Sequence, residues 1–153
     1  MARRTFEDIA LGERFLVGRA TPSRAEAIEL ARRFEPQPHH VDEEAARASI
    51  YGGLTLCSLH LFAVVTRLFF DMRDPIAVLA MLGKDEVRLP APARPDEELA
   101  YWTECVAKRP SQTKPDRGIV VLADSLQNPR GEAVLTQQVT LLVARREASE
   151  RAG

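Results

Sequence analysis

The rest of the chain is organised around residues 34–58, which read FEPQPHHVDEEAARASIYGGLTLCS. This segment holds His39 and His40, and a carboxylate, Glu35, lies five residues before His40. Prolines restrict the backbone between Glu35 and His40, and a pair of glycines precedes a long apolar run. A carboxylate, an imidazole and the start of a helix are the groups needed for acid–base chemistry beside a polarised carbonyl. We therefore expect the functional site here.

A helix is predicted immediately before this segment. Ser23 followed by Glu26 is the pattern of a capping box, and apolar residues then recur at helical spacing as far as Phe34. Pro36 disfavours helical geometry at the preceding residue, so the helix is expected to end at Glu35. The carboxylate is thereby placed at a helix end, shortly before the histidines.

Two further helices are predicted after the histidines. Asp42 can cap a short one that ends near Ala48. Residues 57–72 form a longer one, with apolar side chains on every side, which is typical of a buried helix. The other segments are strand-like, and in chain order they are 14–21, 76–82, 86–89, 99–108, 119–127 and 132–144.

One buried helix followed by a run of antiparallel strands indicates an α+β fold. We expect a single domain over residues 1–153, with the polar tail 145–153 frayed. A hydrophobic content of 45% argues against disorder. A small sheet on one helix leaves an edge strand and an apolar face uncovered, which favours a symmetric dimer.

Composition also bounds the partners and the location. A formal net charge of −1 gives no support to nucleic-acid binding. The longest apolar run, residues 59–70, is too short and too polar to span a membrane. Acidic residues soon after the start are unlike a secretory signal, and two cysteines suggest no disulfide framework. These features predict a cytoplasmic protein.

Short motifs in the chain resemble those of the MaoC-like dehydratase family, which includes the R-specific enoyl-CoA hydratases. They are EPQPHH at 35–40, DEEAA at 42–46 and YGG at 51–53, and RPSQTKPDRG at 109–118 is also similar. The resemblance implies a hot-dog fold, an antiparallel sheet wrapped around one long buried helix. It also implies a homodimer, or a dimer of dimers, with the substrate tunnel at the subunit interface.

The same resemblance implies roles for individual residues. Glu35 and His40 would be the catalytic pair, although the family's usual residue at the first position is Asp. The backbone amide of Ser58, where the family has Gly, would polarise a thioester carbonyl. Thr66 would supply the hydroxyl that orients the carboxylate. Lys114 and Arg117, in a loop with hydroxyl side chains, are candidate contacts for coenzyme A phosphates.

Each of these residues also has a purely structural interpretation. His40 could be a loop histidine bonded to the backbone, Ser58 an ordinary helix cap, and Thr66 a hydroxyl bonded to its own helix. Glu35, Lys114 and Arg117 could simply be solvated charges. Asp42 is interpreted as a cap before it is considered as a catalytic carboxylate.

No metal site is predicted. His39 and His40 are expected to point in different directions in extended chain, and neither a carboxylate–histidine helix motif nor a paired-cysteine motif accompanies them or His60. Cys57 is expected to be a structural cysteine, although His60 three residues later is a conceivable base.

The predicted activity is hydration of a trans-2-enoyl-CoA thioester, or the reverse dehydration. Coenzyme A enters as part of the substrate, and no other cofactor is expected because the thioester supplies the activation. Two alternatives remain open: a hot-dog acyl-CoA thioesterase, and a non-catalytic protein that binds acyl-CoA or acts in assembly.

Overall fold

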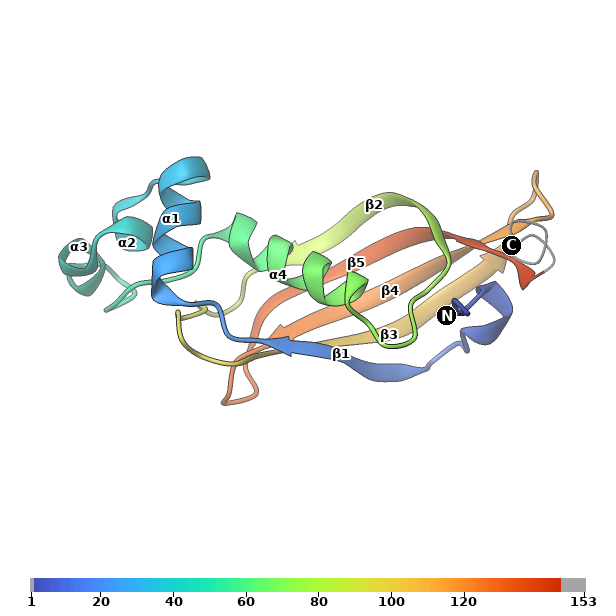
Figure 1. The fold of residues 1–153 in the computed structure, drawn as a ribbon, viewed down its shortest axis with the longest axis horizontal. Helices are drawn as coiled ribbons and strands as arrows, with labels where there is room; N and C mark the ends of the chain where they lie inside the picture. Colours follow the sequence, from blue (N-terminus) through green and yellow to red (C-terminus); the bar gives the residue numbers. More distant parts are fainter. Residues whose placement is uncertain (1, 147–153) are drawn as a thin grey trace.

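The computed structural model describes residues 2–146 of the chain (Figure 1). Its elements, in chain order, are a 3-10 helix η1 (Phe6–Asp8), β1 (Arg14–Ala20), α1 (Arg24–Phe34), α2 (Pro38–Val41), α3 (Glu43–Ala48), α4 (Ser58–Phe70), β2 (Val78–Arg88), β3 (Leu99–Pro110), β4 (Arg117–Gln127) and β5 (Ala133–Ala144).

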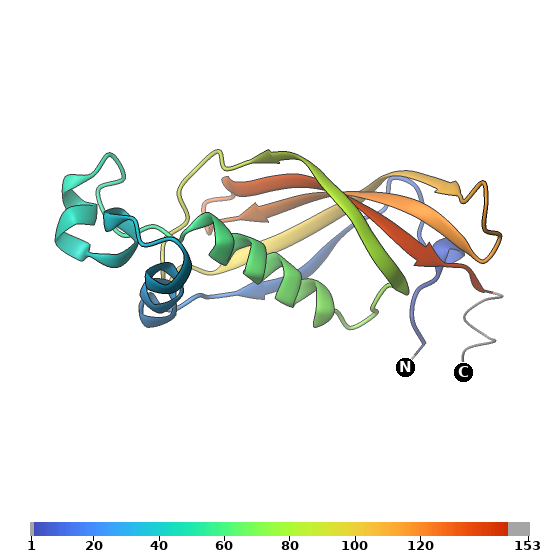
Figure 2. The same ribbon diagram turned by 90° about the horizontal axis from the view of Figure 1, so that it is seen from above.

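The strands form one antiparallel sheet in the order β1-β3-β4-β5-β2. Helix α4 lies along one face of this sheet, and α1, α2 and α3 gather beyond one end of it (Figures 1 and 2). The predicted α+β class, with a sheet curled around one long helix, is confirmed. Within residues 2–146, no helix covers the other face of the sheet in either view.

The core lies between α4 and the sheet, where alternate strand residues point inward. In β4 the buried positions are strictly alternate, as expected for a strand with one buried face. Two apolar clusters result, one around Leu61 and Leu126 and the other around Leu122 and Val143. Between them, Asp124 and its cross-strand neighbours form a buried polar row.

Two local predictions need correction. The segments 76–82 and 86–89 are not separate strands, because Gly83, Lys84 and Asp85 continue the pairing with β5 and shifts in register absorb the irregularity. His39 and His40 do not lie in extended chain, because they belong to the short helix α2, which begins at Pro38. Proline suits the first turn of a helix, where its missing N–H has no partner to lose.

Helix α4 is not buried on all sides within one chain, contrary to the prediction. Its residues Leu59 and Phe70 are 45% and 74% exposed. The edge strand β2 is also exposed at apolar positions, with Leu79 at 52% and Met81 at 57%. The apolar side chains on α4 are therefore only partly covered by the sheet, and Phe70 lines a cavity together with Met81 of the edge strand β2.

The C-terminal tail is expected to fray from residue 145, but Arg145 and Arg146 are held by contacts with η1. Arg145 Nε donates to Glu7 Oε1 at 2.7 Å, and Arg146 Nη2 donates to Asp8 Oδ1 at 2.8 Å. These contacts tie the end of β5 to η1. Residues 147–153 lie outside the described part of the chain.

Candidate active site

A cavity of about 340 Å³ lies at the N-terminal end of α4. The end of α1, helix α2, the start of α4 and the segment after β2 all contribute to its walls. Among the residues that line it are Glu35, His39, His40, Ser58, Leu61 and Ala93. The structure thus brings three of the predicted site residues, Glu35, His40 and Ser58, into one cavity.

Glu35 caps the C-terminus of α1, as predicted from Pro36. Its backbone N–H donates to Ala31 O at 2.8 Å, and its φ of −148° ends the helix. Its carboxylate then has two neighbours: Oε2 accepts from Ser58 Oγ at 3.1 Å, and Oε1 lies 3.8 Å from His40 Nε2. The second distance is too long for a direct hydrogen bond, so an oxygen atom of a ligand can approach both groups.

His40 is buried, and Thr55 holds its ring through the Nδ1 atom, on the side away from Glu35. Nδ1 lies 2.8 Å from Thr55 O and 3.0 Å from Thr55 Oγ1. A carbonyl oxygen can only accept, so Nδ1 carries a proton and the neutral ring keeps its lone pair on Nε2. Nε2 is the atom that faces Glu35, and it can therefore accept a proton in the cavity.

Arg94 holds the loop that carries Thr55, and no sequence motif includes this residue. Its Nη1 donates to Gly53 O at 2.8 Å and to Leu54 O at 3.3 Å, and its Nη2 donates to Tyr51 O. A guanidinium that binds successive carbonyls restrains the backbone strongly. No local pattern reveals this contact, because Arg94 lies 41 residues after Gly53.

Ser58 is the first residue of α4, and Cys57 is its N-cap. An amide at this position has no acceptor within its own helix and lies at the positive end of the helix dipole. The Ser58 hydroxyl does not cap the helix but donates to Glu35, so the simple capping interpretation is wrong. Because Ser58 lines the cavity, its amide is a candidate donor to a ligand oxygen there.

Thr66 does not lie with Glu35. It lines a different cavity farther along α4, and the hydroxyl that contacts the carboxylate comes from Ser58. The turn between β3 and β4 holds Lys114, and Arg117 follows it as the first residue of β4. This turn lies at the opposite end of the molecule from α1 and α2 (Figure 1). Arg117 Nε donates to Asp116 Oδ1 at 2.7 Å. A single chain therefore does not bring these basic residues to its own Glu35.

The neighbouring histidines also differ from expectation. His39 and His40 do not diverge, because α2 brings their ring centroids to within 4.1 Å of each other. The His39 ring also lies 4.9 Å from that of Tyr51. Asp42 caps α3, with Oδ1 accepting from Ala45 N at 2.8 Å, which confirms the capping interpretation.

The surroundings of Cys57 do not activate its thiol as a nucleophile. The residue is fully buried, and that burial raises the pKa of its thiol. His60 is directed toward α1, with Nε2 3.9 Å from Glu26 Oε1, and burial lowers the pKa of its ring. A buried thiol with a raised pKa has little of the thiolate needed for a nucleophile.

Comparison with known proteins agrees with this architecture. Residues 10–124 match the MaoC-like domain family. The crystal structure of the MaoC-like dehydratase from Rhodospirillum rubrum is 38% identical, with a TM-score of 0.87, over 94% of this chain and 98% of that one. An uncharacterised protein from Bacillus subtilis, YdeM, is 24% identical over 91% of this chain and 98% of its own.

A more distant structure shares the fold. The R-hydratase PhaJ1 from Pseudomonas aeruginosa, in its unliganded form, has a TM-score of 0.76 at 14% identity, over 93% of this chain and 86% of that one. The chain belongs to the MaoC-like domain family and has the hot-dog fold. The family and fold predicted from the sequence are confirmed. Among residues 2–146, no helix is long and apolar enough to cross a membrane.

Proposed function

We propose that the protein is an acyl-CoA hydratase or dehydratase acting on trans-2-enoyl-CoA thioesters. The observation that carries the proposal is the 3.8 Å separation of Glu35 Oε1 and His40 Nε2, with Nδ1 of the same ring bonded to Thr55. A water molecule about 2.8 Å from each of the two atoms fits this spacing. It would present its oxygen to a substrate held in the cavity.

Hydration then requires the transfer of one proton from the water to C2 of the substrate. As the water oxygen bonds to C3, Nε2 of His40 takes a proton from the water, and the resulting imidazolium returns it to C2. The Glu35 carboxylate orients the water and stabilises the imidazolium. Water is added across the double bond with no change of oxidation state, so the reaction itself requires no redox group.

The N-terminus of α4 would support the same reaction. When the nucleophile attacks C3, negative charge develops on the thioester oxygen. The backbone amide of Ser58 lies at the positive end of the helix and would bind that oxygen. Because this interaction uses the backbone, serine can serve where the family has glycine.

A homodimer is proposed from the uncovered apolar surface of α4 and β2. Antiparallel pairing of β2 with a second β2 would satisfy the open strand edge and cover Met81 and Phe70. Such a pairing reverses the long axis of the second copy. It would bring Lys114 in the β3–β4 turn of one copy, and Arg117 at the start of β4, to the same end as the other copy's Glu35. Contacts with coenzyme A phosphates are proposed only in this arrangement.

The direct test is hydration of crotonyl-CoA, followed as loss of the enoyl absorbance. Turnover without release of free thiol is expected. Thiol release would instead identify a thioesterase, and saturable binding without turnover would identify a non-catalytic acyl-CoA-binding protein. Failure to turn over short, medium and branched enoyl-CoA substrates would overturn the proposal.

A further inference from the structure

We infer that the preferred substrate carries a hydroxyl at the far end of its acyl group, and that Gln137 recognises it. This inference rests on the proposed function and specifies the substrate class. It comes from a second cavity, of about 300 Å³, between α4 and the strands β2, β4 and β5. The apolar part of its lining includes Val65, Phe69, Met81, Leu122, Val139 and Leu141.

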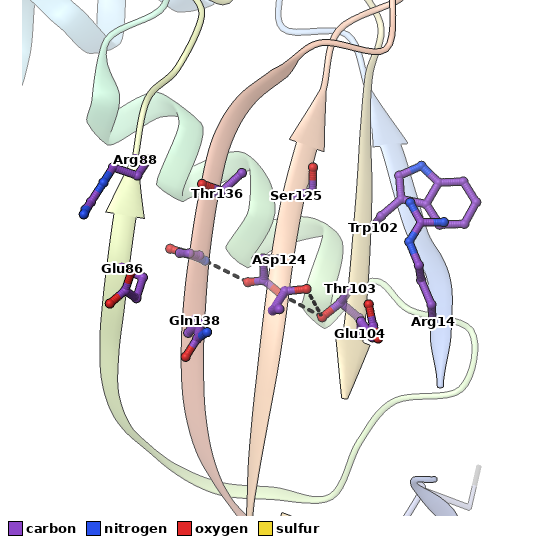
Figure 3. A pocket seen from close by; sticks show the side chains of 12 residues that line it. Arg14, Glu86, Arg88, Trp102, Thr103, Glu104, Asp124, Ser125, Thr136 and Gln138 are labelled. Carbon is purple, nitrogen blue, oxygen red and sulfur yellow. Dashed lines mark hydrogen bonds between the residues drawn. The ribbon is translucent and has the colours of Figure 1, made fainter. Parts of the chain in front are cut away.

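The floor of this cavity is polar. Asp124 and Gln137 line it, and their exposed fractions are only 5% and 3%. Asp124 Oδ1 accepts from Thr103 Oγ1 at 2.8 Å, and Oδ2 accepts from Gln137 Nε2 at 2.8 Å. Figure 3, which shows a pocket on the opposite face of the sheet with α4 behind the strands, includes the contact between Asp124 and Thr103. Three neighbouring strands thus contribute one residue each to a row of hydrogen-bonded side chains beneath the helix.

One polar atom in this row has no partner. Gln137 Oε1 is buried, and no hydrogen-bond donor for it lies within the described residues 2–146. A buried acceptor left without a donor is unfavourable, and nearly all such groups in proteins are satisfied. Gln137 lines the apolar cavity, so a ligand there that brings a hydrogen-bond donor could satisfy this oxygen after a small movement of the side chain.

A hydroxyl fits the row better than a methyl or a carboxylate end. A methyl group leaves Gln137 Oε1 without a donor. A carboxylate adds acceptor oxygens beside the Asp124 and Gln137 oxygens, although Lys84 at the cavity would attract it. A hydroxyl donates one bond and accepts others, so it suits an amide–carboxyl pair.

The second cavity lies one helical turn beyond the first along α4. Leu61 lines the cavity that holds Glu35, and Val65, one turn later, lines the second. On β5, Val134 lines the first cavity and Gln137 the second. Seven residues separate Ser58 from Val65, which is about 10 Å along a helix axis. A medium-length acyl chain held at Ser58 would reach this region.

The test compares matched substrates of increasing length: trans-2-hexenoyl-, octenoyl- and decenoyl-CoA and their ω-hydroxy analogues. We expect kcat/KM to favour the hydroxy analogue by about tenfold, the value of one buried hydrogen bond, at the length that reaches Gln137. Q137M, which keeps the side-chain length but removes the amide, should abolish the preference. Q138M, on the outer face of the same strand, should retain it.

The outcomes separate this inference from the proposed function. Turnover of the plain enoyl-CoA series without preference for any hydroxy analogue overturns the inference and leaves the hydratase proposal standing. If no substrate is turned over, calorimetry of each pair decides: about tenfold tighter binding of the hydroxy form supports recognition by Gln137, and equal binding overturns it. The wild-type comparison needs no variant, so a misfolded Q137M does not prevent the test.

Discussion

Ser58 Oγ lies 3.1 Å from Glu35 Oε2, so the two residues at which this chain departs from the usual motif of its family are direct partners. Where the motif resemblance leads us to expect Asp and Gly, this chain has a carboxylate one methylene longer and a hydroxyl that holds it. Glycine has no side chain to make that contact. We interpret the two departures as a coupled change that keeps the carboxylate at its distance from His40.

If Glu35 and Ser58 are coupled, the effects of E35D and S58G on kcat/KM should not be additive in the double variant. E35D and S58G should each lower kcat/KM by about tenfold or more, because each breaks the contact that positions the carboxylate. The double variant, which has the family's pair, should recover part of the loss. A double-mutant cycle of hydration rates measures the coupling. A rise in rate for E35D alone would instead show that Glu35 is a lesion in a decayed site.

Removal of the carboxylate's charge tests its chemical role. E35Q keeps the shape of the side chain and can still bond to Ser58, but it cannot stabilise an imidazolium. The expected loss in kcat is about a hundredfold, typical of one acid–base group. E29Q, an exposed glutamate on the same helix, is the matched control and should retain the parent rate. If E35Q keeps the parent rate, Glu35 is not part of the catalytic machinery.

Arg94 should act as a positioning residue through the loop that carries Thr55. R94A removes donors to three carbonyls, and loss of such bonds should lower the free energy of unfolding by about 2 kcal/mol. It should also lower kcat more than it raises KM, because His40 loses its orientation. R94K should recover part of kcat. Denaturant unfolding and steady-state rates measure both effects, and R32A, exposed on α1, is the control. Loss of stability without loss of kcat would assign Arg94 a purely structural role.

Because Asp124 is buried, we expect the difference in stability between D124N and the wild type to depend on pH. Burial raises the pKa of its carboxyl, against the lowering effect of hydrogen bonds from Gln137 and Thr103. A raised pKa means that the stability contributed by the protonated form is present at low pH and is lost as pH rises through the folded-state pKa. D124N cannot ionise, so its stability relative to wild type should increase from acidic to neutral pH. Urea unfolding across that range measures the difference, and a constant difference would contradict the prediction.

The exposed apolar edge predicts a dimer. Sedimentation at micromolar concentration should give about twice the 17.0 kDa of one chain. M81D places a charge on the β2 edge and should shift the protein toward monomer. V106D, at an exposed apolar position on β3, should leave the mass unchanged. A wild-type mass of one chain would refute the dimer.

Local sequence was sufficient for much of the fold. Pro36 ends α1 at Glu35, Asp42 caps α3, and the apolar run before Asp71 becomes α4. These features depend on backbone preferences and on contacts a few residues apart, which a local pattern records. The family motif added the pairing of Glu35 with His40.

Tertiary structure decided the contacts that make the site specific. Thr55 reaches His40 across 15 residues, and Ser58 reaches Glu35 across 23. The row of Thr103, Asp124 and Gln137 needs three strands in register, and register is a property of the whole sheet. The exposure of α4 also depends on what the sheet leaves uncovered. Such contacts join residues far apart in the chain, so no local pattern could show them.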